Sequence, residues 1–362
     1  MTIFLQATFE GLSLGAIYSL VAIGFVLIYK ATDVLSFAQP ALAVVGAGII
    51  SALAVDRGVP FWIAFIIGII FTGLIGLLVE RTFLRPMVGE PVFSVAILTI
   101  GIDILLRTIL NNWIGIDPRY LGDPFPSFGN FGSFDINGVT LKYLEIAALI
   151  TAIILIGILS VFFKRSKYGI AMRATSFDQE AALAQGINVG RVFGLVWLIA
   201  GILAGFSGFF ITGGFNTLTQ ASFVSALRAL PAVVIGGLDS ISGAVVGSLI
   251  IGLTQGYIAY YQLSLESISG LTLGSGFSLI APYLVMFVIL LIKPDGLFGT
   301  KEVERVWAKD LIYTPVIKLK LQFFQHHFKN FGLHYWLSFH LQYLSFFQII
   351  GYYWLQLPYW LQ

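Results

Sequence analysis

Residues 11–29 read GLSLGAIYSLVAIGFVLIY and carry no charge between Glu10 and Lys30. At 1.5 Å per residue this stretch makes a helix of about 28 Å, which matches the hydrocarbon core of a bilayer. Residues 1–9 lack the basic start of a cleavable signal peptide, so the stretch is expected to remain as a membrane span. The sequence therefore begins like a membrane protein.

The composition extends this interpretation to most of the chain. The 362 residues are 58% hydrophobic and only 10% charged, with a mean hydropathy of +0.92, whereas soluble domains carry about 25% charged residues. Further apolar runs occupy residues 41–55, 61–79, 92–110, 144–163, 192–213, 222–238, 241–262 and 278–292. They predict an all-α polytopic membrane protein with about eight transmembrane helices. The runs 41–55 and 222–238 are short or marked by Gly and Pro, so one or both are expected to be broken or re-entrant.

Basic residues predict the orientation of the spans. If the polar segment 164–191 is cytoplasmic, alternation of the spans places Arg81, Arg85, Lys293 and Lys301 on the same side, and Arg57, Arg119 and Lys142 on the other. This asymmetry agrees with the positive-inside rule. The turn-rich loop 112–142 is then external, as is the N-terminus if 41–55 spans fully.

The segment 164–191 is the longest polar interruption, and it contains the pattern Glu180-Ala181-Ala182-x-x-x-Gly186. Alanine favours helix, and Gly186 suits a helix end. A short helix with charged flanks fits a groove on a soluble ATPase; the alternative is a plain solvated loop. The candidate ATPase-coupling residues are Arg173, Asp178, Glu180, Ala181, Ala182 and Gly186.

The same pattern resembles the EAA coupling motif of ATP-binding-cassette importer permeases. Further blocks, in family order, are similar to the branched-chain amino acid permease branch: GAIYSLVAIG (15–24), LSFAQ (35–39), YGIAMRA (168–174), GINV (186–189), RALPAVVIGG (228–237), GA (243–244) and KPDGLFG (293–299). The resemblance covers about residues 10–300. Where the family usually has Asn and His-Gly in its first turn, this chain has Ser36 and Gln39-Pro40, so the titratable imidazole is absent there.

This resemblance implies a permease domain over residues 1–300, multi-pass in a bacterial inner membrane, that imports branched-chain or other neutral amino acids. It also implies two ATPase subunits, a second related permease and an external substrate-binding protein. The sequence contains no P-loop, so ATP hydrolysis is assigned to partner subunits. No enzymatic activity, cofactor or nucleic-acid partner is expected. The aromatic-rich tail 301–362 does not resemble the family and is expected to have no role in transport.

Polar breaks and ionisable residues inside the spans mark a candidate translocation pathway. Transporters often place polar, interrupted helices at the pathway, and the breaks here are Ser36, Gln39, Pro40 and Pro231. Asp103 and Arg107 lie four residues apart on one helix face, where a structural ion pair is narrowly favoured over a functional one. Arg228 lies near the external end of its run, placed to meet a substrate carboxylate. Hydroxyl and amide side chains precede it, namely Asn216, Thr217, Thr219, Gln220, Ser222 and Ser225.

Three other functions stay open at this point. A permease for urea or short amides belongs to the same broader branch. An ion-coupled secondary transporter needs buried acidic or histidine relays, and Asp103 is the single clear intramembrane carboxylate in the sequence. A membrane-embedded enzyme needs paired carboxylates or a His/Cys cluster, but the chain has no cysteine and its four histidines all follow residue 325.

Overall fold

The computed structural model describes residues 2–122, 124, 132–136, 138–177, 179–213, 217–269, 274 and 276–299. All of them lie in one unit, Met1–Lys301. The candidate coupling residue Asp178 and the tail 301–362 lie outside the described residues.

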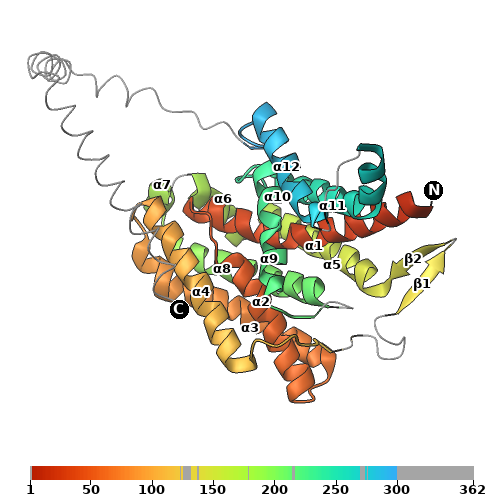
Figure 1. Cartoon of the computed structure of the whole chain (residues 1–362). Helices are drawn as coiled ribbons and strands as arrows, with labels where there is room; N and C mark the ends of the chain where they lie inside the picture. Colours follow the sequence, from red (N-terminus) through yellow and green to blue (C-terminus); the bar gives the residue numbers. More distant parts are fainter. Residues whose placement is uncertain are drawn as a thin grey trace, which may run out of the picture. The chain divides into compact units, whose positions relative to one another are not determined.

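Within this part of the chain, seven helices are long and apolar enough to cross a membrane. They are α1 (Thr2–Thr32), α2 (Gln39–Ser51) continued by η1 (Ala52–Asp56), α3 (Phe61–Val79) continued by η2 (Glu80–Leu84) and η3 (Arg85–Met87), α4 (Val92–Ile114), α5 (Tyr143–Arg165), α8 (Val189–Thr212) and α11 (Ile241–Ser269). Shorter helices are α6 (Lys167–Phe177), α7 (Gln179–Ala184), α9 (Ala221–Leu227), α10 (Ala229–Gly236) and α12 (Phe277–Ile292) (Figure 1). The predicted all-α polytopic membrane fold is confirmed, because every apolar run of the sequence is mainly helical. About eight crossings were predicted, and seven helices of the described chain are long enough.

The two runs expected to be broken behave differently. Run 222–238 is interrupted at Arg228, between α9 and α10. Pro231 lies in the first turn of α10, where its missing N–H removes no helical hydrogen bond. Run 41–55 is continuous, since Pro40 stands at the start of α2, a position that suits proline. Thus one of the two runs contains the break.

The ends of the helices form two groups, which we name by what they carry. One group, which we call the coupling end because α6 and α7 there hold candidate coupling residues, is where the Gln179 amide donates to the Ala31 carbonyl at 3.3 Å. The hairpin end holds β1 (Ser133–Ile136) and β2 (Val139–Lys142), which pair antiparallel with Ser133 opposite Lys142. The Gln6 amide joins this hairpin to the start of α1 by donating to the Thr140 carbonyl at 2.9 Å.

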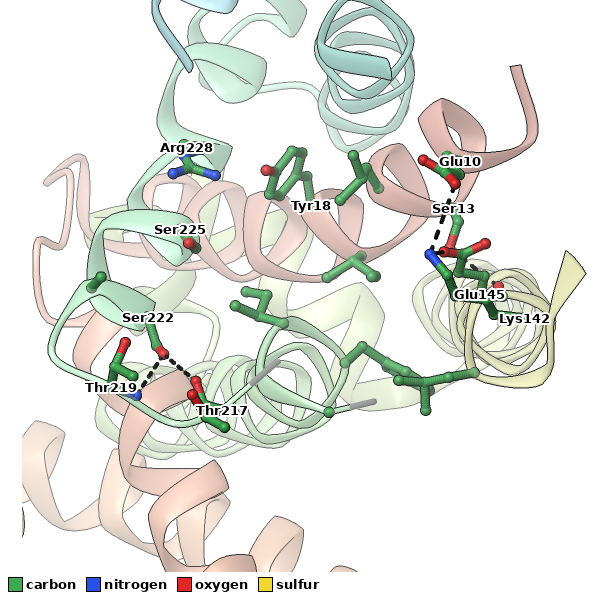
Figure 2. Close-up of a pocket in the computed structure, with 17 residues that line it drawn as sticks. Glu10, Ser13, Tyr18, Lys142, Glu145, Thr217, Thr219, Ser222, Ser225 and Arg228 are labelled. Carbon is green, nitrogen blue, oxygen red and sulfur yellow. Dashed lines mark hydrogen bonds and ion pairs between the residues drawn. The ribbon is translucent and has the colours of Figure 1, made fainter. Parts of the chain in front are cut away.

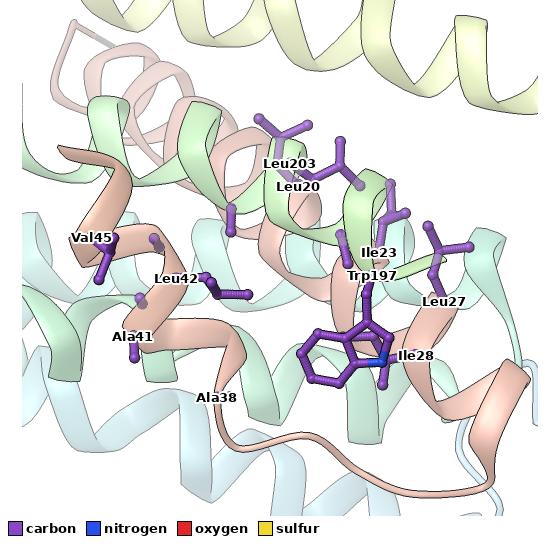
Figure 3. Close-up of a cluster of buried hydrophobic side chains, with 14 of the residues drawn as sticks. Leu20, Ile23, Leu27, Ile28, Ala38, Ala41, Leu42, Val45, Trp197 and Leu203 are labelled. Carbon is purple, nitrogen blue, oxygen red and sulfur yellow. The ribbon is translucent and has the colours of Figure 1, made fainter. Parts of the chain in front are cut away.

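The core lies around α1, which packs against α5, α8, α10 and α11. Buried side chains of α1, such as Leu20 and Ile23, meet Leu42 of α2 and Leu203 of α8 (Figure 3). Helices α3, α4 and α5 instead expose many large apolar side chains on one face. In a bilayer those faces meet acyl chains, so their exposure is expected for the outer helices of a membrane bundle.

Glycines spaced by four residues, Gly11 and Gly15 on α1 and Gly252 and Gly256 on α11, bring these two helices into direct backbone contact. A Cβ added to Gly252 would fall on the backbone nitrogen of Gly15 and the backbone oxygen of Gly11, well inside contact distance. We expect Gly252→Ala to destabilise the permease by about 1–3 kcal/mol through overpacking. Thermal unfolding in detergent would measure the loss. Gly157→Ala is the control, because a Cβ there meets no atom of the described chain within 4 Å; equal melting temperatures for the two variants would contradict the proposed contact.

Candidate functional site

A cavity of about 580 Å³ lies in the hairpin-end half of the bundle (Figure 2). It is enclosed by α1, β2, α5, the end of α8 and the α9–α10 segment. Its lining residues are Glu10, Ser13, Leu14, Ile17, Tyr18, Lys142, Leu144, Glu145, Phe210, Ile211, Gly213, Thr217, Thr219, Ala221, Ser222, Ser225 and Arg228. The polar groups gather toward two ends of this cavity, with apolar side chains between them.

Arg228 marks one end. The break between α9 and α10 places its half-buried guanidinium beside the buried ring of Tyr18, whose hydroxyl donates to Gln255 Oε1 at 2.9 Å. The four hydroxyl residues that precede Arg228 in the sequence also line the cavity: Thr217, Thr219, Ser222 and Ser225. Among the described residues, no carboxylate forms a salt bridge with Arg228, so its charge is available to an anion.

The opposite end carries two carboxylates and one amine. Lys142 Nζ lies 2.9 Å from Glu145 Oε1 and 3.8 Å from Glu10 Oε1. Burial lowers the pKa of Lys142, but the hydrogen bond to Glu145 and the two carboxylate charges outweigh it and raise the pKa above its usual value. The amine is therefore charged at neutral pH. Beside this one amine lie two carboxyl groups, those of Glu10 and Glu145, so acidic groups outnumber basic ones at this end.

The separation of the two ends limits what they can bind together. Glu10 and Tyr18 stand eight residues apart on α1, which is about 12 Å along the helix axis. The ammonium and carboxylate of one α-amino acid are much closer than this. The two ends can therefore act on a small zwitterion in succession, the acidic end on its ammonium and Arg228 on its carboxylate.

A second cavity, of about 130 Å³, lies at the coupling end. Ser36 from the turn after α1 lines it, together with Trp197 of α8 and Glu80 of η2. The Glu80 carboxylate is buried and accepts two hydrogen bonds from Arg85, at 2.9 and 3.1 Å. Arg85 also donates to the Gly190 carbonyl at 2.8 Å, which joins η3 to the start of α8.

The other pathway candidates do not share either cavity. Gln39 is buried and its amide donates to the Ala200 carbonyl at 2.9 Å, which ties α2 to α8. Asp103 accepts a hydrogen bond from Arg107, and the Arg107 guanidinium lies 4.1 Å from the centre of the Phe223 ring. This arrangement ties α4 to α9. The predicted pathway residues are thus divided among separate parts of the bundle.

Of the candidate coupling residues, Arg173 lies on α6, Glu180, Ala181 and Ala182 lie on α7, and Gly186 follows α7. Glu180 and Ala181 are exposed, whereas Ala182 is buried. Gly186 adopts φ = 80°, a left-handed conformation that favours glycine, and ends this turn. The backbone N–H of Ile187 donates to the Ala182 carbonyl at 3.0 Å across it. The Glu-Ala-Ala-x-x-x-Gly pattern therefore has a local structural role, as a short helix with a glycine cap.

Residues 7–292 match the family model described as the permease component of the branched-chain amino acid transport system. The chain belongs to this family. The match runs from Ala7 in α1 to the end of α12, and so covers nearly all of the helical bundle.

Relatives of this family align over most of their length. BraD of Pseudomonas aeruginosa, named a high-affinity branched-chain amino acid transport system permease protein, is 27% identical over 84% of this chain and 98% of its own. LivH of Methanocaldococcus jannaschii, named a probable branched-chain amino acid transport permease protein, is 29% identical over 79% and 90%. The fructose import permease protein FruF of Bifidobacterium longum is 26% identical over 69% of each chain.

Three features of these sites were not predicted from the sequence. Glu10 and Glu145 are far apart in the chain, and only the fold brings them to Lys142. In the sequence, Trp197 lies within an apolar run, a pattern that is typical of an ordinary aromatic core residue. Phe177, at the end of α6, has 95% of its surface exposed; in the sequence, its signal was an apolar residue between Ser176 and Asp178.

Proposed function

We propose that this protein is the membrane-spanning subunit of an ATP-driven importer for branched-chain or other neutral amino acids. The observation that carries the proposal is the family match over residues 7–292, with relatives aligned over nearly their whole length. The hairpin-end cavity supports the substrate class, since Arg228 at one end suits a carboxylate and the carboxyl groups of Glu10 and Glu145 at the other suit an ammonium. The subunit itself performs no chemistry.

The coupling end faces the cytoplasm of a bacterial inner membrane in this proposal. Basic residues gather there: Lys30, Arg81, Arg85, Lys164, Arg165, Lys167, Arg173, Arg191 and Lys293. At the hairpin end the corresponding residues are Arg57, Arg119 and Lys142. The excess of basic residues at the coupling end supports its cytoplasmic placement by the positive-inside rule.

The importer needs partners for each step outside the membrane. Two ATPase subunits bind α6 and α7 from the cytoplasm, a second related permease completes the translocation unit, and an external binding protein delivers substrate to the hairpin-end cavity. Movement of α7 reaches α1 through the hydrogen bond from Gln179 to Ala31. It reaches α8 through the short connection from Ile187 to Val189. The spans then change from an outward-open to an inward-open arrangement.

A neutral amide such as urea fits the cavity less well. It brings no charge to Arg228 and none to the carboxylates around Lys142, so charged groups would lose water on substrate entry without gaining an ionic partner. The polar and charged lining therefore favours the amino acid over the urea or short-amide alternative.

Uptake competition tests the proposal. In a strain that lacks only this subunit, plasmid-borne expression is expected to restore uptake of labelled leucine. Excess unlabelled isoleucine or valine should suppress that uptake by at least about tenfold, while glutamate, urea and fructose should leave it near the uncompeted level. Suppression by urea or fructose, with no suppression by isoleucine, would assign a different substrate class.

A further inference from the structure

The coupling-end cavity contains two buried polar atoms that have no hydrogen-bond partner in the described structure. They are the hydroxyl of Ser36, 0% exposed, and the indole Nε1–H of Trp197, 1% exposed. Both residues line the cavity, as does Ile28, which lies near the Trp197 ring in Figure 3. A buried donor without an acceptor is unfavourable. The two groups therefore call for a ligand that brings acceptor oxygens.

The remaining walls of this cavity are mainly apolar. Val34, Val95 and Phe193 surround the space beside the two donors. Glu80 supplies a carboxylate, 1% exposed, whose charge is balanced by Arg85. The site thus combines donors for an anionic group with an apolar surface for an aliphatic chain. Each Glu80 oxygen accepts one hydrogen bond from Arg85 and can accept a second from a cationic group.

The mouth of the cavity belongs to the coupling end. Val88, Gly89 and Glu90, which follow η3, line it and are exposed. Gln179 of α7 lines another part, so the cavity adjoins the segment proposed to receive the ATPase. A ligand from the cytoplasmic side would therefore reach the cavity without passing through the bundle.

We propose that this cavity is a second binding site, open to the cytoplasm, for a small aliphatic amino acid. The ligand's carboxylate accepts hydrogen bonds from Ser36 and Trp197, its aliphatic chain packs on the apolar walls, and its ammonium lies toward Glu80. The inference rests on the proposed function for the choice of an amino acid over another aliphatic carboxylate. It adds an inward site, separate from the hairpin-end cavity, at which the transported molecule is held before release.

Inside-out membrane vesicles test this site, because they expose the coupling end to the medium. Binding of labelled leucine is measured on the assembled importer without nucleotide and without the binding protein. Trp197→Phe removes the indole donor and keeps an aromatic ring, while Ser36→Ala removes the hydroxyl. Each is expected to weaken binding by about tenfold or more, the range for a lost hydrogen bond to a charged group. Trp113→Phe, at the opposite end of α4, is the matched control and should bind as the unaltered importer does.

Two analogues separate the possible ligands. 3-Methylbutylamine lacks the carboxylate and 4-methyl-2-oxopentanoate lacks the ammonium, so neither should compete with leucine. Equal competition by the oxo acid would overturn the assignment of an amino acid. Binding that is absent, or unchanged in both Trp197→Phe and Ser36→Ala, would overturn the site itself.

The same importer variants are also prepared in right-side-out vesicles, where ATP-driven leucine uptake is measured. This second measurement distinguishes failure of the inward site from failure of the proposed function. Normal uptake with no inward binding would overturn the second site alone. No uptake by the unaltered importer would overturn the proposed function, while donor-dependent leucine binding in inside-out vesicles would still support the site.

Discussion

Replacing Phe177 with aspartate should abolish ATP-driven uptake while leaving the permease folded in the membrane. The ring is 95% exposed, so its loss removes almost no packing within the subunit. Buried aromatic anchors commonly contribute 2 kcal/mol or more to a protein interface, and an aspartate in their place adds the desolvation of a charge. We expect affinity for the ATPase subunits to fall by at least about thirtyfold. Titration of purified ATPase onto the permease in nanodiscs measures that affinity directly.

Two variants make this result specific. Phe177→Leu keeps an apolar side chain and should retain most of the affinity for the ATPase. Ile116→Asp changes an exposed apolar residue at the hairpin end, where no ATPase is expected to bind, and should leave the affinity unchanged. If Phe177→Asp binds the ATPase as tightly as the unaltered permease, the exposed ring is not part of the contact.

The helices could be predicted because membrane insertion imposes a length and an absence of charge that are visible locally. Residues 11–29 suffice for α1, and the same criteria find the other spans. The detail of the breaks depends on where a proline falls within a helical turn. Pro231 suggested the interruption of 222–238, but the chain breaks at Arg228, because proline is compatible with the first turn of α10. The hairpin β1–β2 was not predicted from the loop that contains it, and its pairing with Gln6 is a long-range contact.

The candidate sites could be predicted only where their residues are neighbours in the chain. Arg228 and the hydroxyl residues before it form a local pattern, and the structure gathers Thr217, Ser222 and Arg228 around one cavity. The acidic end of that cavity depends on the packing of α1 against α5, which local sequence does not specify. Ser36 was a candidate for its polarity within an apolar context, but its relation to Trp197 needed the packing of α8 against the end of α1.

Neutralising Arg228 should reduce uptake more than any other single change in the hairpin-end cavity. The guanidinium has no carboxylate partner among the described residues, so its strongest ionic interaction is left for the substrate. A hydrogen-bonded interaction with a charged group contributes about 1.5–3 kcal/mol, and Arg228→Gln should therefore lower kcat/KM for leucine uptake by about ten- to a hundredfold. Arg228→Lys keeps the charge but loses the planar pair of donors that suits a carboxylate, so an intermediate loss is expected.

Arg57→Gln is the matched control, because Arg57 is an exposed arginine at the same end that does not line the cavity. Surface amounts of each variant and binding of the external substrate-binding protein should be unchanged, so that any loss reports on translocation. An equal loss of leucine uptake for Arg57→Gln and Arg228→Gln would mean that uptake depends on positive charge anywhere at the hairpin end. It would contradict a specific carboxylate site at Arg228. A selective loss for Arg228→Gln that Arg228→Lys partly restores would instead place the substrate carboxylate at the break between α9 and α10.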